Sequence, residues 1–277
     1  SMADYRIGFK WWALIIAVVF VISELVCVVC VPERPVACDE KPGKISDMFK
    51  ALFKNDQAMT VVVSIILVYT SLNICGNLVL YFFRFDVGNE GAYSIFAAVA
   101  FAAQVLVMMV IPLLRKRFSK SQLFISGFII QIAGFAVILI MAFAKLYTPQ
   151  SWYILCLPGI LIYLGYGMLN VIMTIFLSDS VDYGEVMNGT REESVIFSMQ
   201  TFTVKLASGV AVFLAGLVVD WIHLDTAAAV QTQDTLDALR MWMTIPSVIL
   251  LIVGIFVFKR FYKLDDTRME EIKSKLN

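Results

Sequence analysis

The chain contains seven apolar runs, each long enough to cross a lipid bilayer as a helix. The hydrocarbon core of a bilayer is about 30 Å thick, and a helix crosses it in roughly 20 residues. The runs cover residues 11–31, 58–83, 92–114, 122–144, 152–178, 197–222 and 241–258. The sequence therefore predicts seven membrane-spanning helices.

The amino-acid composition agrees with lipid as the solvent of these runs. Hydrophobic residues make up 60% of the chain and charged residues 16%, whereas about a quarter of the residues in soluble domains are charged. A membrane β-barrel would need strands in which apolar and polar residues alternate, but these runs are apolar on nearly every face. The predicted fold class is an all-α membrane protein.

Positive charges gather in alternate connections between the runs. Lys and Arg cluster in residues 32–57, in residues 115–120 and in the tail at residues 259–277. Because connections rich in Lys and Arg remain in the cytoplasm, we expect these three segments on the cytoplasmic side. The N-terminus is then outside and the C-terminus is cytoplasmic.

Two polar segments carry apolar residues at helical spacing. Residues 32–57 begin with three prolines and then show Ile45, Met48, Phe49, Leu52 and Phe53. The tail repeats the pattern with Met269, Ile272 and Leu276. Such spacing predicts amphipathic helices at the membrane interface, which we expect to act as tethers without a ligand-binding role.

Polar side chains follow one face of the second run. Tyr69, Asn73, Asn77 and Tyr81 recur every four residues, which places them on the same side of a helix. Carboxamides donate and accept hydrogen bonds at the same time, and aromatic rings cover the apolar face of a sugar ring. The face suits a polyhydroxylated ligand, while hydrogen bonding between helices is the open alternative.

The fifth and sixth runs add further polar groups. Asn170 and Tyr166 put polar atoms in the interior of the fifth run, and Thr201 and Lys205 share a face of the sixth with Gln200 beside them. Lys205 lies roughly 12 Å along the helix from Phe197 at about 1.5 Å per residue. An unpaired ammonium at the centre of a bilayer costs about 2.5–3.5 kcal/mol, which favours a water-filled cavity or an acidic partner.

Charges of both signs stand where the fifth run ends. Asp179 and Asp182 lie one helical turn apart, and Arg191 follows them in a segment that we expect to be a short cytoplasmic loop. Half-exposed ion pairs are worth only about 0–1 kcal/mol each. The three residues therefore suit a latch that breaks and re-forms as a gate opens.

The five cysteines do not indicate a metal site. Cys27 and Cys30 lie inside the first run, where free thiols behave as small hydrophobic side chains. We predict no metal site, no cofactor and no enzymatic residues for this chain. The expected partners are the lipid bilayer and a small molecule, and nucleic acid is not among them.

These motifs together resemble a known family. The segment from Asp179 to Glu185, the Gly-Thr-Arg-Glu-Glu-Ser segment around Arg191 and the run from Phe197 to Lys205 are similar in order and type to the glycoside-pentoside-hexuronide:cation symporters. The resemblance covers essentially the whole chain.

This resemblance implies a major-facilitator-type fold of twelve helices in two six-helix halves, in the plasma (inner) membrane of a bacterium. The first run, in residues 1–31, resembles the last helix of the N-terminal half, and residues 32–57 resemble the central cytoplasmic loop. Residues 58–258 resemble the complete C-terminal half, followed by a cytoplasmic tail at 259–277. The chain is then expected to be a C-terminal fragment or one half of a split carrier.

The family relationship also implies roles for single residues. Substrate binding is expected at Lys205, Gln200, Thr201, Tyr69, Asn73, Asn77 and Asn170, and a cytoplasmic charge network at Asp179, Asp182 and Arg191. The melibiose carriers of the family place a tryptophan where this chain has Asn170, so a galactoside does not follow. The co-transported Na⁺, H⁺ or Li⁺ would bind in the N-terminal half, which becomes an expected partner.

Two other classes stay open from the sequence. A seven-helix receptor or retinal protein would use Lys205 for a Schiff base, although it would also need a buried acidic counter-ion. A truncated product that inserts without transporting is the second alternative.

Overall fold

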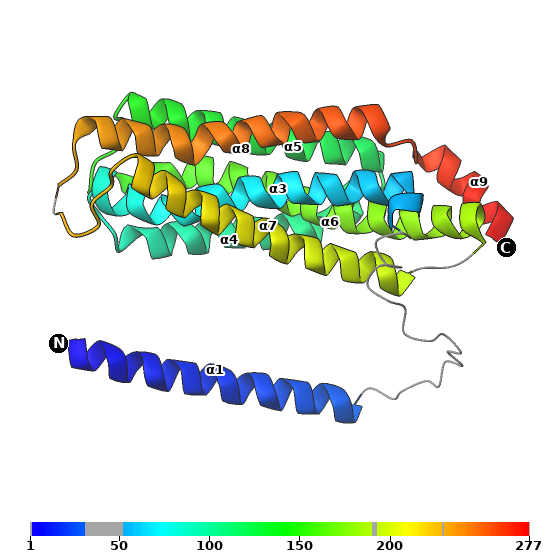
Figure 1. Ribbon diagram of the computed structural model, residues 1–277, viewed down its shortest axis with the longest axis horizontal. Coiled ribbons are helices and arrows are strands. Elements are labelled where there is room, and N and C mark those ends of the chain that lie inside the picture. The colour runs from blue at the N-terminus through cyan, green and yellow to red at the C-terminus, as the bar shows by residue number, and fades with distance from the viewer. Residues whose placement is uncertain (1, 31–51, 190–192, 229, 277) are drawn as a thin grey trace. The chain divides into compact units, whose positions relative to one another are not determined.

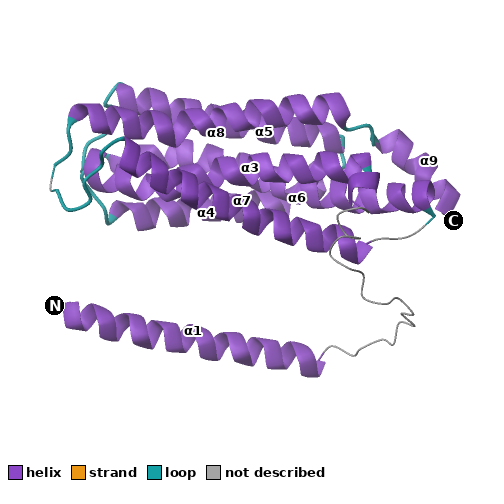
Figure 2. Ribbon diagram, viewed as in Figure 1, coloured by secondary structure: helices purple, strands orange, loops and turns teal. Residues whose placement is uncertain are grey.

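A computed structural model describes residues 2–30, 52–189, 193–228 and 230–276. These residues hold seven helices that are long and apolar enough to cross a membrane, and the same ranges contain no strand (Figure 2). The prediction of an all-α membrane protein with seven spans is confirmed. The chain divides into two units, Ser1–Gly43 and Lys44–Asn277, which we describe separately.

The described part of the first unit is a single helix, α1 (Met2–Cys30). Its side chains from Ile7 onward are exposed, and residues Ile7–Cys30 form one candidate span. A helix that is apolar all round is stable in lipid rather than in water. Residues 31–51, with Ile45, Met48 and Phe49 of the predicted interfacial helix, lie outside the described residues.

The second unit is a bundle of six long helices (Figure 1). Helix α3 packs against α6, α7 and α8, while α6 also packs against α4 and α5. The spans that contain α3 and α6 are the two most deeply buried of the seven. The six helices are α3 (Asp56–Tyr81), α4 (Ala92–Leu114), α5 (Lys120–Phe143), α6 (Cys156–Asn188), α7 (Glu193–Trp221) and α8 (Gln233–Phe261).

Helix α6 is longer than the apolar run that predicts it. The helix continues ten residues past Ser178 and stops at Asn188, where Gly189 takes the left-handed conformation with φ of +73°. Glycine adopts this conformation without the penalty that a Cβ brings, so it ends helices efficiently. The expected loop from Asp179 is therefore mostly helix, and both aspartates lie on α6.

Two other helices also extend past their apolar runs. Helix α8 begins at Gln233, eight residues before the predicted start, because the Thr232 side chain accepts a hydrogen bond from the Thr235 backbone N–H and caps the helix. Helix α3 continues directly into a five-residue π-helix, η1 (Phe82–Asp86). Hydropathy does not predict either extension, because these helix ends carry polar residues.

Glycines bring α5 and α6 into close contact. A Cβ on Gly134 would lie 2.6 Å from Ile162 Cγ1 and 2.7 Å from its backbone nitrogen. A Cβ on Gly165 would lie 2.6 Å from the backbone oxygen of Gly127 and 2.6 Å from the backbone nitrogen of Gln131. Helices in membranes associate largely by van der Waals packing, which small residues at the interface strengthen.

The tail forms a short helix, α9 (Asp266–Leu276), which packs against the far end of α6. Met269 and Ile272 are buried and contact Tyr183 and Val186 of α6. The amphipathic pattern in the tail predicted a helix, which α9 confirms, and the apolar side chains of this helix pack against α6. Because α6 extends beyond its apolar run, it offers an apolar surface that the tail covers.

Candidate substrate site and charge networks

A hydrogen bond joins the two central helices at a pair of predicted substrate residues. The Asn170 side chain on α6 donates from Nδ2 to the Tyr69 hydroxyl oxygen on α3, at 2.6 Å. Both side chains are half-buried, and the Tyr69 ring meets the Tyr166 ring edge-on at 5.6 Å. The structure thus brings together residues that are 101 positions apart in the chain.

The other two carboxamides of the polar face bond to their own helix. Asn73 donates to the Tyr69 carbonyl at 2.8 Å, and Asn77 donates to the Asn73 carbonyl at 2.7 Å. Each carboxamide has two N–H donors and an oxygen acceptor, so one bond leaves it with further capacity. The side chains form a half-buried polar ladder on α3 that begins at the Tyr69–Asn170 pair.

The three predicted residues of α7 lie apart from this pair. Lys205 and Thr201 are exposed and Gln200 is partly buried, and the Thr201 hydroxyl donates to the Phe197 carbonyl one turn earlier, at 3.3 Å. Helix α7 packs along α3. Within the described ranges, no hydrogen bond or ion pair links Lys205 to Tyr69 or Asn170.

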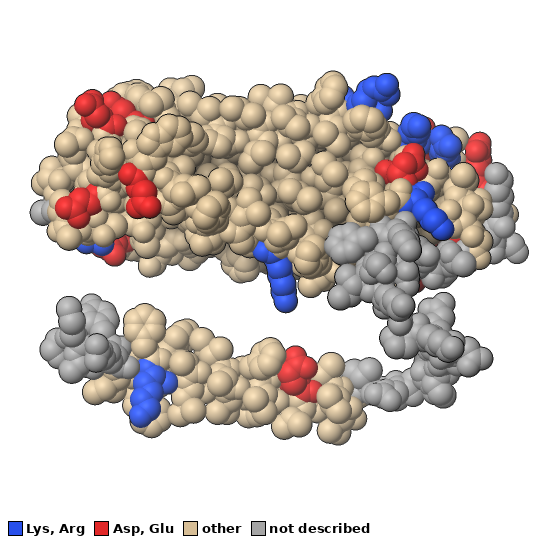
Figure 3. All heavy atoms as spheres, in the orientation of Figure 1, with Lys and Arg blue, Asp and Glu red and all other residues tan. Residues whose placement is uncertain are grey.

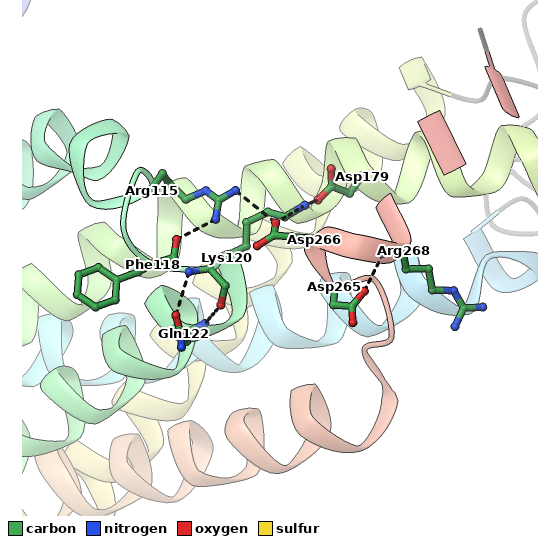
Figure 4. A network of polar contacts seen from close by, with 9 residues as sticks. Arg115, Phe118, Lys120, Gln122, Asp179, Asp265, Asp266 and Arg268 are labelled. Carbon is green, nitrogen blue, oxygen red and sulfur yellow. Dashed lines mark hydrogen bonds and ion pairs between the residues drawn. The ribbon is translucent and has the colours of Figure 1, made fainter. Parts of the chain in front are cut away.

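Charged side chains gather at the two ends of the second unit, and the face between them is mostly uncharged (Figure 3). At the end where α9 lies, Lys120 of α5 forms a buried ion pair with Asp179 of α6. Asp266 of α9 lies 3.4 Å from the Lys120 ammonium and 3.3 Å from the Arg115 guanidinium (Figure 4). We call these four residues the Lys120 network.

Local structure places Lys120 in this network. Ser119 accepts a hydrogen bond from the Gln122 backbone N–H, and the Gln122 side chain accepts one from the Ser119 backbone N–H, which forms a capping box at the start of α5. Lys120 is therefore the first residue of the helix and faces α6. Partial burial raises the pKa of Asp266, but the charges of Lys120 and Arg115 outweigh it and hold the pKa below its usual value.

Sequence reasoning named only one residue of the Lys120 network. The sequence predicts Asp179, whereas it indicates Lys120 and Arg115 only as positive charges that orient the membrane helices. Asp182 lies partly buried on α6, one turn beyond Asp179, and Arg191 lies outside the described residues. The capping sequence Ser-Lys-Ser-Gln was a signal that could have placed Lys120 at a helix start.

A second buried charge cluster holds the opposite end of the bundle. Arg240 of α8 donates from Nε to Asp86 of η1 at 2.8 Å, and the two side chains are only 4% and 3% exposed. Tyr147 donates its hydroxyl to Asp86 at 2.5 Å, and Asp237 accepts from Arg240 at 2.7 Å. Burial and the neighbouring Asp86 raise the pKa of Tyr147, so it remains a donor. The amino-acid sequence alone does not predict this cluster.

The fold and these sites define a multi-pass α-helical membrane protein with a polar ladder in its core and charge clusters at both ends. A family model described as MFS/sugar transport protein matches residues 3–266. The chain belongs to this family, which confirms the resemblance found in the sequence. The match gives no support to the retinal-protein alternative.

Curated relatives include an uncharacterised symporter of Bacillus subtilis, 25% identical over 84% of this chain and 49% of the relative. The raffinose carrier protein of Pediococcus pentosaceus is 24% identical over 100% of the chain and 43% of the carrier. The isoprimeverose transporter of Lactiplantibacillus pentosus is 25% identical over 93% and 52%. The chain thus spans about half the length of these relatives.

Proposed function

We propose that this chain supplies the C-terminal six-helix half of a bacterial sugar:cation symporter, with α1 as the last helix of the other half. The family match and the two relatives named as sugar carriers support this proposal. Na⁺, H⁺ or Li⁺ would be co-transported, bound in an N-terminal half that acts with this chain in the inner membrane. The C-terminus would be cytoplasmic, which would place the Lys120 network on that side.

The observation that carries the proposal is the Tyr69–Asn170 hydrogen bond between the two central helices. It puts a phenol and a carboxamide at the head of a half-buried polar ladder on α3. A sugar hydroxyl both donates and accepts, so it can replace either partner of this bond. Lys205, Gln200 and Thr201 would contact the sugar from α7.

Alternating access would then proceed by rocking of one half against the other around this site. The Lys120 network would hold the cytoplasmic side closed while the site faces outward, and we propose that Asp182 and Arg191 take part in the same closure. Cation binding would raise the affinity for sugar, and sugar would raise the affinity for the cation by the same factor.

The test is sugar accumulation by this chain co-expressed with the helices that precede it in full-length relatives. Raffinose and isoprimeverose are the first labelled sugars to try, in vesicles with an imposed Na⁺, Li⁺ or H⁺ gradient. We expect Lys205→Ala to abolish accumulation, while Lys145→Ala, which changes an exposed lysine in a connection, leaves it intact. Unchanged uptake by Lys205→Ala would remove the role assigned to this residue.

A second variant separates sugar binding from helix packing. If Asn170 binds sugar, Asn170→Ala raises the KM for uptake about tenfold, which corresponds to about 1.4 kcal/mol. If it only joins α3 to α6, the variant lowers thermal stability, by about 0.6 kcal/mol for a typical bond between membrane helices, and leaves the KM unchanged. The second result would move the substrate site elsewhere.

A further inference from the structure

A groove runs along the outside of the bundle between α7 and α8. Both helices pack along α3, which forms the floor of the groove. The cavity measures about 770 Å³ and is lined by residues of all three helices. Its walls include Val210 and Leu214 from α7 and Met241 and Ile249 from α8, all of them exposed.

The groove is apolar along its whole length. Among the lining residues, only Thr70 and Trp242 carry a side-chain oxygen or nitrogen. Thr70 lies on the floor and is only 6% exposed. An unfilled gap between the two walls would lose the dispersion contacts of its lining side chains. An apolar molecule in the groove would restore these contacts and exclude water. A hydrocarbon makes such dispersion contacts with the lining.

The floor of the groove lies near the middle of the span that contains α3, Asp56–Asp86. From Ile66 to Ile74 its floor covers about 12 Å of helix at about 1.5 Å per residue, less than half of a hydrocarbon core of about 30 Å. A second cavity of about 220 Å³ shares Ile74 and Leu214 with it and reaches Trp221. The Trp221 and Trp242 rings stand 5.1 Å apart at this end, and tryptophan is enriched where hydrocarbon meets the headgroups.

Helix α7 presents two different faces. Lys205, Gly209 and Gly216 share one face, and a Cβ on either glycine would meet no atom within 4 Å. Val210 and Leu214 lie about 120–160° further round the helix and face the groove. Small residues favour the close approach of another helix, so the first face suits protein and the bulky second face suits lipid.

We propose that the groove binds an acyl chain of a phospholipid from the leaflet at the Trp221–Trp242 end. A protein helix is about 10–12 Å wide with its side chains, too thick to enter between two helices that both touch α3. A hydrocarbon chain is thinner, and its length matches a groove that runs from the headgroup level toward the bilayer centre. The bound lipid fills the space between α7 and α8 and joins them.

The first experiment is native mass spectrometry of the full 277-residue chain, purified in detergent and titrated with dioleoyl phosphatidylcholine. We expect one lipid to remain bound. Leu214→Trp fills the groove and should weaken binding by about tenfold or more, about 1.4 kcal/mol. Phe213→Trp, on the neighbouring exposed residue outside the groove lining, is the matched control and should bind as the unaltered chain does.

A second measurement uses the unaltered chain, in case Leu214→Trp does not fold. Vesicles of phosphatidylcholine with a photoreactive diazirine in the acyl chain are irradiated, and the labelled residues are mapped. We expect label on the groove floor, at Ile66, Leu67 and Ile74. Label confined to outward side chains such as Phe213 and Ile252 would overturn the proposal, as would equal lipid binding by both tryptophan variants or a dimer that Leu214→Trp dissociates. None of these outcomes depends on which molecule the protein transports.

Discussion

Lys120 and Asp179 form an ion pair between the first residue of α5 and the C-terminal part of α6, with each side chain only 7% exposed. The residues are 59 positions apart in the sequence. A buried charge needs a partner of opposite sign, because an unpaired buried ion has lost its hydration without gaining a compensating ion pair. This pair and the Asp86–Arg240 pair hold opposite ends of the same bundle.

Removing one partner of the Lys120 pair should destabilise the bundle strongly. We expect Lys120→Ala to lower the free energy of unfolding by about 3–5 kcal/mol, because Asp179 would stay buried without a counter-charge. Thermal unfolding in detergent measures this change. Lys116→Ala, at an exposed position of the same basic segment, should change stability by less than about 0.5 kcal/mol. Equal effects would mean that the pair is not buried in the folded protein.

The cluster at the other end offers a matched pair of arginines. Arg240→Ala should lower stability by about 3–5 kcal/mol, since Asp86 loses its buried partner. Arg84→Ala, also near η1, removes an exposed pair with Glu90 at 3.7 Å and should cost about 0–1 kcal/mol. If Arg240→Ala is as mild as Arg84→Ala, the pair between Asp86 and Arg240 is not buried in the folded protein.

Glycine substitutions test the contact between α5 and α6. Gly165→Ala places a Cβ 2.6 Å from backbone atoms of α5, and we expect a loss of about 1–3 kcal/mol from overpacking. Gly209→Ala, on the open face of α7, should leave the stability of this chain unchanged or slightly improved. A neutral Gly165→Ala would show that α5 and α6 lie further apart than described.

The docking of α9 should depend on pH. The charges of Lys120 and Arg115 hold the pKa of Asp266 below its ordinary value of 3.8. A carboxylate with a lowered pKa stabilises the folded state above its unfolded pKa, and that stabilisation is lost as the pH falls through the folded pKa. We therefore expect the tail to resist proteolysis at pH 7 and in mildly acidic buffer, and to become more susceptible below about pH 4.

In Asp266→Asn the resistance of the tail should no longer depend on pH in this range. Asp265→Asn changes the neighbouring exposed carboxylate and serves as the control. A tail that is cleaved at the same rate at pH 3 and pH 7 in the unaltered chain would contradict the role of Asp266, and the apolar contacts of Met269 and Ile272 alone would then hold α9.

The sequence alone determined the number and type of the spans, because an apolar run in lipid must satisfy its backbone hydrogen bonds internally and does so as a helix. It also determined the family, through the order of Asp179, Arg191 and Lys205. It identified Tyr69 and Asn170 as polar groups in apolar runs, but their pairing depends on how α3 and α6 pack.

Only the tertiary structure decided which charges meet. Lys120 with Asp179 and Asp86 with Arg240 join residues 59 and 154 positions apart, and hydropathy holds no information on such pairs. The structure also shows that α6 continues to Asn188 and that the tail packs against it. Polar residues beyond an apolar run remain helical when neighbouring elements supply contacts for their side chains. The lengths of the apolar runs thus follow from the thickness of the lipid bilayer, whereas the ion-pair partners follow from the way the helices pack.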